Sequence, residues 1–249
     1  MAQAELIYGV HPVLEMLRAN PEAVRRVYVA DKVADRKVEE IVDLSRSAGV
    51  EITRIPRKEL SNRLGDAVHQ GVALETSPFR FSELSDLFAL AESRGERPLF
   101  LALDHVQDPH NFGALARSAY ALGAHGILIP KNRSAPVTPT VLKSSAGAIV
   151  HLPIVQVTNL SRSLRDLKKQ GMWIVGTVAE NASPLAQVDF TESIGLVIGS
   201  EGKGLREKVE ELCDFRAHIP MPGKLGSLNA SVAGGICLYE AARQRSCGG

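Results

Sequence analysis

The stretch LFLALDHVQDPHNFGALAR, residues 99–117, joins an apolar run to a polar loop and then to a helix. Residues 99–103 are all apolar, which is typical of a strand buried on both faces of a parallel sheet. Residues 104–113 are mostly polar, glycine or proline, and indicate a strand that ends in a loop. Ligands of parallel α/β sheets bind at the carboxyl ends of strands, so this loop is a candidate site. Asp108-Pro109 and Asn111 equally suit a capped turn that starts a helix.

Apolar runs alternate with helical patterns through the rest of the chain. Further strands are expected at residues 126–129, 154–157, 173–178, 196–198 and 217–219, and helices at 114–122, 160–170, 204–212 and 231–244. Such alternation predicts an α/β fold with a mostly parallel sheet covered by helices.

The N-terminal part has a shorter, mixed pattern. Strands are expected at residues 24–30, 50–55 and 71–74, and a helix at 36–48, which together predict a small α/β unit. A segment with one short helix near residues 84–90 and no other apolar periodicity then follows. The predicted division is an N-terminal domain at 1–76, a linker at 77–97 and a larger domain at 98–249.

Composition excludes several classes of protein. The 249 residues are 45% hydrophobic and carry a net charge of +1, from 29 Lys+Arg and 28 Asp+Glu. Such a chain forms a globular core, and it is not a purely electrostatic binder of nucleic acid. The three cysteines are far apart, which argues against a disulfide framework or a zinc cluster and fits a reducing cytoplasm. Neither an export signal nor a stretch of 18 apolar residues is present, so we expect a cytoplasmic protein without membrane spans.

Two more segments are rich in glycine and proline. Residues 198–205, IGSEGKGL, place three glycines after an apolar strand, without the spacing of a Walker A loop or of G-x-G-x-x-G. Residues 219–231, IPMPGKLGSLNAS, form a loop that leads into a helix. Each segment alone is as consistent with a plain turn, or with a helix N-cap at Ser227 or Asn229, as with a ligand site.

Taken together, these segments resemble the SpoU (TrmH-type) family of RNA ribose 2′-O-methyltransferases, in the SPOUT superfamily. The matching residues are Asn111-Phe112-Gly113 with Arg117, residues 198–202, and residues 219–221 with 227–233. The N-terminal part is similar to the family's ribosomal-protein-like substrate-binding domain, by its YGVHPV at residues 8–13 and HQGV at 69–72. The resemblance is nearly full length, and it is closest to the RlmB-type enzymes that methylate guanosine in 23S rRNA.

The resemblance implies a SPOUT-type parallel sheet with a deep trefoil knot near the C-terminus, a feature that topology rules alone reject. It also implies a homodimer with each active site at the interface. The small N-terminal α/β domain is then expected to bind RNA.

By the same resemblance, the chain transfers a methyl group from S-adenosylmethionine to the ribose 2′-oxygen of a guanosine in 23S rRNA. The expected cofactor-binding residues are Thr177, Gly199, Ile219, Met221, Ser227 and Leu228. Arg117 is the expected catalytic residue, and Asn111, Glu201, Asn229 and Ser231 are expected to position it and the ribose. No metal is expected, because the methyl donor is already activated.

The role of Arg117 follows from its chemistry. A guanidinium stays protonated, so we expect Arg117 to clamp the phosphate beside the reacting ribose rather than to act as a base. Without the resemblance, the alternative is an ordinary arginine on a helix surface.

The partner is expected to be rRNA, and tRNA is the alternative substrate for the same chemistry. Other classes are a non-catalytic RNA-binding assembly factor and a nucleotide-dependent dehydrogenase, which the absent G-x-G-x-x-G disfavours. The cations that are close in sequence in the N-terminal domain form either a phosphate-contacting face or a solvated surface interleaved with acids. They are Arg25, Arg26, Lys32, Arg36 and Lys37.

Overall fold

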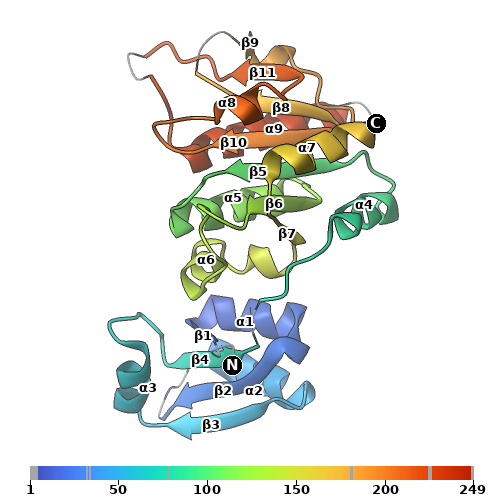
Figure 1. Cartoon of the computed structure of the whole chain (residues 1–249). Coiled ribbons are helices and arrows are strands. Elements are labelled where there is room, and N and C mark those ends of the chain that lie inside the picture. Colours follow the sequence, from blue (N-terminus) through green and yellow to red (C-terminus); the bar gives the residue numbers. More distant parts are fainter. Residues whose placement is uncertain are drawn as a thin grey trace. The chain divides into compact units, whose positions relative to one another are not determined.

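The computed structural model describes residues 5–31, 33, 35–77, 79–179, 182–223 and 226–247. The chain forms two compact units, Met1–Arg80 with Val137–His151 and Phe81–Pro136 with Leu152–Gly249 (Figure 1). Each unit has its own sheet. No helix in the described part of the chain is long and apolar enough to cross a membrane.

The second unit is built on a seven-stranded sheet in which every pair of neighbours is parallel. The order is β7-β6-β5-β10-β8-β11-β9. The strands are β5 (Leu99–Asp104), β6 (Gly126–Pro130), β7 (Ile154–Val157), β8 (Trp173–Thr177), β9 (Ser183–Pro184), β10 (Ile194–Gly199) and β11 (Phe215–His218). The predicted parallel α/β sheet is confirmed, and each predicted apolar run is a strand.

Helices cover both faces of this sheet (Figure 1). On one face lie α4 (Leu84–Ser93), α7 (Leu160–Lys169) and α8 (Glu207–Glu210), and on the other α5 (Pro109–Ala121) and α9 (Ala230–Cys247). Phe100 and Ala102 of β5 face the first layer, in one buried cluster with Leu164 of α7. In the second layer, α9 brings Gly234 so close to α5 that an added Cβ would lie 2.3 Å from Leu115 Cδ2.

Two predicted helices had wrong bounds. Helix α5 begins at Pro109 rather than at residue 114, because Asp108 caps it by accepting the His110 N–H at 2.9 Å. The capped-turn interpretation was therefore right, and Asn111 lies inside the helix. Helix α8 spans only Glu207–Glu210 instead of residues 204–212.

His125 lies between α5 and β6, and its side chain contacts the start of β5. Its side chain is fully buried, and its Nδ1 accepts the Leu99 N–H at 3.1 Å. Nε2 therefore carries the proton and donates to Glu96 at 3.0 Å. Burial lowers the pKa of His125, and the nearby Glu96 carboxylate opposes that shift.

The first unit has a four-stranded sheet of order β1-β4-β2-β3. The strands are β1 (Glu5–Tyr8), β2 (Val24–Ala30), β3 (Glu51–Ile55) and β4 (Val72–Thr76), with helices α1 (Val10–Ala19), α2 (Arg36–Ser47) and α3 (Arg57–Leu64). Strands β2 and β3 are parallel, whereas β4 runs antiparallel to β1 and β2. The predicted small α/β unit is confirmed, and β1, α1 and α3 are additions to it.

A later segment also belongs to the first unit. It contains α6 (Pro139–Ser144) and the short 3₁₀ helix Ala148–Val150, and two more 3₁₀ turns lie elsewhere at Pro21–Ala23 and Leu185–Gln187. His151 Nε2 lies 3.0 Å from Glu15 Oε2 of α1. Gly147 has φ +85°, and a Cβ there would lie 2.4 Å from the Glu15 Cβ, so this contact requires glycine. Nothing in the sequence pattern predicted that residues 137–151 pack on α1.

Candidate active site

The strand order of the second unit locates the site. Strands β6 and β7 lie on one side of β5, whereas β10 and β8 lie on the other. After β5 the chain continues toward β6 on one side, and after β10 it continues toward β11 on the other side. The two connections therefore separate at the carboxyl ends of β5 and β10, and such a switch point leaves a crevice for a ligand. Asn111 follows β5 and Glu201 follows β10.

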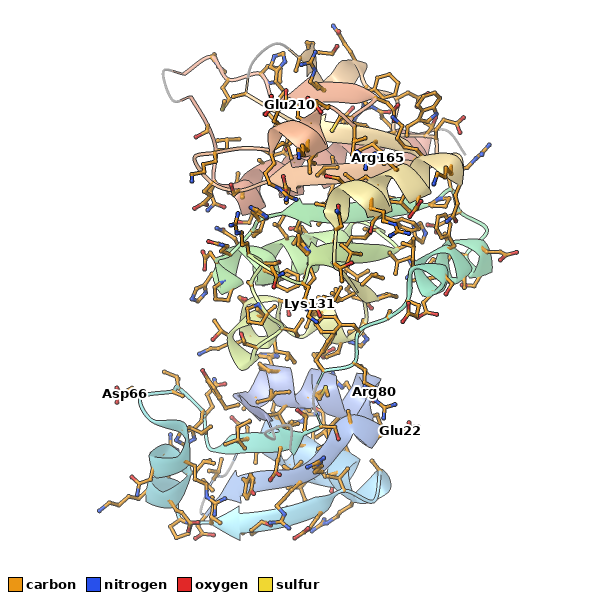
Figure 2. All side chains as sticks on the ribbon, viewed as in Figure 1. Glu22, Asp66, Arg80, Lys131, Arg165 and Glu210 are labelled. Atoms are coloured by element: carbon orange, nitrogen blue, oxygen red, sulfur yellow. The ribbon has the colours of Figure 1, made fainter. Side chains whose placement is uncertain are left out.

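A cavity of about 520 Å³ lies beside these strand ends, a size within the range of cofactor sites. Its wall includes every residue predicted to bind the cofactor: Thr177, Gly199, Ile219, Met221, Ser227 and Leu228. It also includes Glu201, and Glu210, which Figure 2 shows on α8. The six predicted cofactor residues thus come together around one cavity, although residues 177 and 228 are far apart in the sequence.

The wall combines apolar side chains with backbone groups. Ile219, Met221, Ser227 and Leu228 belong to no helix or strand, so helix or sheet ladders do not use their backbone N–H and C=O groups. Thr177, at the end of β8, is held by a hydrogen bond from its Oγ1 to the Val197 carbonyl at 3.2 Å. Apolar surface beside unused backbone groups suits a flat heterocycle with polar edges, such as the adenine of S-adenosylmethionine.

One side of the cavity is a tight turn after β10. Two backbone hydrogen bonds close it, from Ser200 N to Gly204 O at 3.1 Å and from Gly204 N to Ser200 O at 3.0 Å. Gly202 and Gly204 have positive φ angles of 77° and 64°. Gly199 lies against the returning backbone, because a Cβ there would be 2.3 Å from the Gly204 carbonyl carbon. The three glycines therefore allow two parts of the same turn to pack closely against each other.

Glu201, at the tip of this turn, is the centre of a hydrogen-bonded cluster. Its Oε1 accepts from Asn111 Nδ2 at 3.0 Å, from Asn229 Nδ2, and from the Ala230 N–H at 3.4 Å. Asn229 Nδ2 also donates to Asn111 Oδ1 at 2.9 Å. Three segments up to 118 residues apart in the sequence thus meet at one carboxylate oxygen.

Asn229 also caps helix α9. Its Oδ1 accepts the N–H of Ser231 at 2.9 Å and the Ser231 hydroxyl at 2.6 Å. The N-cap interpretation of Asn229 is therefore confirmed, and the same side chain also belongs to the cluster around Glu201. Four of the five predicted catalytic or positioning residues, Asn111, Glu201, Asn229 and Ser231, form this one network.

Arg117 is not part of it. The side chain is exposed on α5, and none of the described residues forms a hydrogen bond or ion pair with its guanidinium. Arg117 and Glu201 do not pair within one chain. The guanidinium, on the same helix as Asn111, remains available to an anionic ligand.

Sequence reasoning missed one pair at the site. Asp104, the last residue of β5, holds Arg206, which directly precedes α8, through the Arg206 Nε at 2.6 Å and backbone N–H at 2.8 Å. The signal was an acidic residue at the end of an all-apolar strand.

Of the two alternatives for the N-terminal cations, a phosphate-contacting face or a solvated surface, the described residues do not favour the single face. Strand β2 spans about 17 Å from Arg25 to Ala30 at roughly 3.4 Å per residue, so Arg25 lies far from Arg36 and Lys37 at the start of α2. Arg26 pairs with Glu51 at 2.7 Å. Lys32 lies outside the described residues.

Two family models match the chain. Residues 98–239 match the SpoU rRNA Methylase family, and residues 6–82 match the RNA 2′-O ribose methyltransferase substrate binding family. The chain belongs to the SpoU rRNA methylase family. The predicted resemblance is thereby confirmed, and so is an α/β fold with a parallel sheet and an N-terminal substrate-binding domain.

Relatives of this SpoU methylase carry specific names. It is 42% identical over 245 residues to the 23S rRNA (guanosine-2′-O-)-methyltransferase RlmB of Coxiella burnetii, covering 98% of each chain. It is 41% identical over 244 residues to the putative TrmH family tRNA/rRNA methyltransferase YacO of Bacillus subtilis, covering 98% of this chain and 97% of that one. Among solved structures, AviRb of Streptomyces viridochromogenes in complex with AdoMet matches with a TM-score of 0.82 at 28% identity, over 99% of this chain and 92% of that one.

Proposed function

We propose that this SpoU methylase transfers a methyl group from S-adenosylmethionine to the ribose 2′-oxygen of a guanosine in 23S rRNA. The observation that carries the proposal is the cavity whose wall contains all six predicted cofactor residues and Glu201. The name of the RlmB relative, at 42% identity over nearly the whole chain, supports the nucleoside and the RNA.

The chain's own residues would align the reactants. S-adenosylmethionine, when bound, supplies an activated methyl group. Arg117 would clamp the phosphate beside the target ribose and stabilise the negative charge that develops on the 2′-oxygen. Asn111 and Asn229, fixed by Glu201, would set the position of the ribose.

We place the methyltransferase domain at 98–249, after an N-terminal RNA-binding domain at 1–76 and a linker at 77–97. Within it we propose a trefoil knot formed by the chain between β10 and α9. Its support is that β10 lies between β5 and β8, and that after β11 the chain returns through a loop to pack α9 on α5. The rRNA substrate and the free thiols of Cys213 and Cys237 fit a cytoplasmic enzyme.

We further propose a homodimer through α9 and α5. Val232, Ile236 and Tyr239 are 50%, 37% and 60% exposed and recur at i, i+4 and i+7, so they form one apolar stripe on α9. Tyr120, 43% exposed, lies one turn from Arg117 on α5. A second copy of this chain would cover the stripe beside Arg117. Light scattering should then give twice the mass of one chain, and Ile236→Glu should give a monomer.

Unit 1 offers one edge for RNA phosphates. The parallel register pairs Ala30 with Ile55, so the segments that follow β2 and β3 emerge at the same edge. Lys37 is in the first turn of α2, and Arg57 and Lys58 are in the first turn of α3. No acidic side chain among the described residues pairs with these three. RNA affinity should fall less steeply with salt concentration in an Arg57→Ala/Lys58→Ala variant than in the wild type. Arg25→Ala, at the opposite end of β2, should change this salt dependence less.

The deciding experiment measures methyl transfer from labelled S-adenosylmethionine to unmodified 23S rRNA and tRNA, followed by nuclease digestion and mass spectrometry. The proposal expects 2′-O-methylguanosine in the rRNA alone. The same product in tRNA alone would overturn the substrate, and no transfer to either RNA would overturn the activity.

The role of Arg117 is tested in the same assay. Arg117→Ala should bind S-adenosylmethionine normally and lose roughly a hundredfold or more in kcat. Arg165→Ala is the matched control, since Arg165 is an exposed arginine of the same unit that Figure 2 shows on α7, a helix of the opposite layer. Equal turnover of the two variants would refute the clamp.

A further inference from the structure

A buried carboxylate beside the cofactor cavity has no part in the proposed chemistry. The Asp104 side chain is 0% exposed, whereas its partner Arg206 is 43% exposed. Burial of a carboxylate is costly unless it is paired and hydrogen-bonded. Among the residues that the structure describes, Asp104 meets that condition through Arg206, which gives it one cation and two donors at 2.6 and 2.8 Å.

The contact between Asp104 and Arg206 follows from the alternation of side chains along β5, in which every second residue points to the same face of the sheet. Phe100 and Ala102 of β5 point into the layer of α4, α7 and α8, and Asp104 has the same parity. Arg206 lies at the start of α8 in that same layer. The pair therefore joins the end of β5 to the segment that leaves the turn after β10.

That turn is attached at both of its ends. Its first end is strand β10 itself, through Gly199. At the other end Leu205 is buried, with its Cδ1 2.7 Å from where a Cβ of Gly176 would lie, and Arg206 follows at once. Between these ends, Glu201 reaches Asn111 and Asn229.

We propose that Asp104 and Arg206 are positioning residues, which fix the turn at residues 199–205 so that it forms the cavity wall and presents Glu201 to the cluster. This inference rests on the proposed function for its cofactor. The position of the turn itself is a property of the chain without any ligand.

Asp214 provides a matched control elsewhere in the same unit. One of its oxygens accepts the Ile174 N–H at 2.9 Å, and the other lies 2.7 Å from Lys168 Nζ. Its side chain is 15% exposed. Asp214 thus repeats the arrangement of one backbone donor and one cation, but it directly precedes β11, at the opposite end of the strands from the cavity.

The experiment compares Asp104→Asn with Asp214→Asn. The first change keeps the size of the side chain, and replaces one acceptor oxygen by an amide that cannot accept from Arg206. We expect the dissociation constant of S-adenosylmethionine, measured by calorimetry, to rise about tenfold in Asp104→Asn and less than twofold in Asp214→Asn. Both variants should lose thermal stability, so stability alone does not separate them.

A second readout needs no ligand. Hydrogen exchange of the Ser200 and Gly204 amides, which close the turn, should accelerate about tenfold in Asp104→Asn and remain unchanged in Asp214→Asn. Arg206→Lys, a change at a half-exposed position, serves if Asp104→Asn fails to fold, and it should accelerate the same two amides. Unchanged exchange and unchanged affinity in these variants would overturn the inference. Accelerated exchange in a chain that binds no S-adenosylmethionine would instead overturn the proposed function.

Discussion

Replacement of Gly199 by alanine should weaken cofactor binding through a collision with the backbone. An added Cβ would lie 2.3 Å from the Gly204 carbonyl carbon, 2.4 Å from its oxygen and 2.5 Å from the Leu205 nitrogen. Non-bonded carbon atoms are normally about 3.5–4.0 Å apart, so the turn must retreat by about 1 Å. All three atoms belong to the main chain, and no change of rotamer relieves the contact.

The size of the effect follows from the two hydrogen bonds that close the turn, at 3.1 and 3.0 Å between Ser200 and Gly204. Each contributes about 0.5–1.5 kcal/mol net, so their loss costs about 2 kcal/mol. If binding requires the closed turn, that cost raises the dissociation constant of S-adenosylmethionine about 30-fold. The overpacking itself should lower the free energy of unfolding by about 1–3 kcal/mol.

Gly195→Ala is the control, on the same strand and also buried. Its added Cβ would meet Ile174 Cδ1 at 2.9 Å, which is the end of a flexible side chain. Calorimetry at 25 °C should therefore give an affinity within about twofold of the wild type, with a similar loss in melting temperature. Equal affinities of Gly199→Ala and Gly195→Ala would refute the reasoning that the turn sets the shape of the cavity.

Three further predictions concern stability and reactivity. Asn229→Ala removes the cap of α9, and thermal unfolding should show a loss of about 1 kcal/mol together with slower single-turnover methyl transfer. Because burial lowers the pKa of His125, the unfolded chain binds a proton that the folded chain does not; urea unfolding should therefore show stability falling below about pH 6.5, and falling less in His125→Asn. Burial raises the pKa of Cys213 and of Cys237 to about 12, so in a Cys247→Ser background both thiols should react with a disulfide reagent at pH 8 only after unfolding.

Much of the second unit could be predicted because its strands are buried on both faces. An uninterrupted apolar run such as residues 99–103, followed at once by a polar loop, is too short for a buried helix and is typical of a strand between two helical layers. The first unit was harder. Helix α1 has Pro12 in its first turn, where proline is tolerated, and this residue obscures the helical pattern that follows. The packing of residues 137–151 on α1 depends on tertiary contacts that no local pattern records.

In the candidate site too, local features could be predicted from the sequence, whereas contacts between distant segments could not. The N-cap roles of Asp108 and Asn229 are local and were visible in the sequence. The meeting of Asn111 with Glu201 depends on β5 and β10 being neighbours, a strand order that was not predicted. Only the resemblance to a known family had assigned both residues to one site. The Asp104–Arg206 pair required the parity of β5 and the short length of α8, and neither follows from spacing.

The two halves of the site use the backbone in opposite ways. Part of the cavity wall, at Ile219, Met221, Ser227 and Leu228, lies outside the helices and strands, so helix or sheet ladders do not use its main-chain groups. The cluster instead lies where two helices begin, since Asn111 is in the first turn of α5 and Asn229 caps α9. The first N–H groups of a helix carry a partial positive charge, which favours the negative charge of Glu201 between them. Its Oε1 is occupied by three donors, so Glu201 acts as a fixed acceptor that orients both asparagines. Under the proposed function, the cluster would align the ribose and Arg117 would bind the anionic substrate.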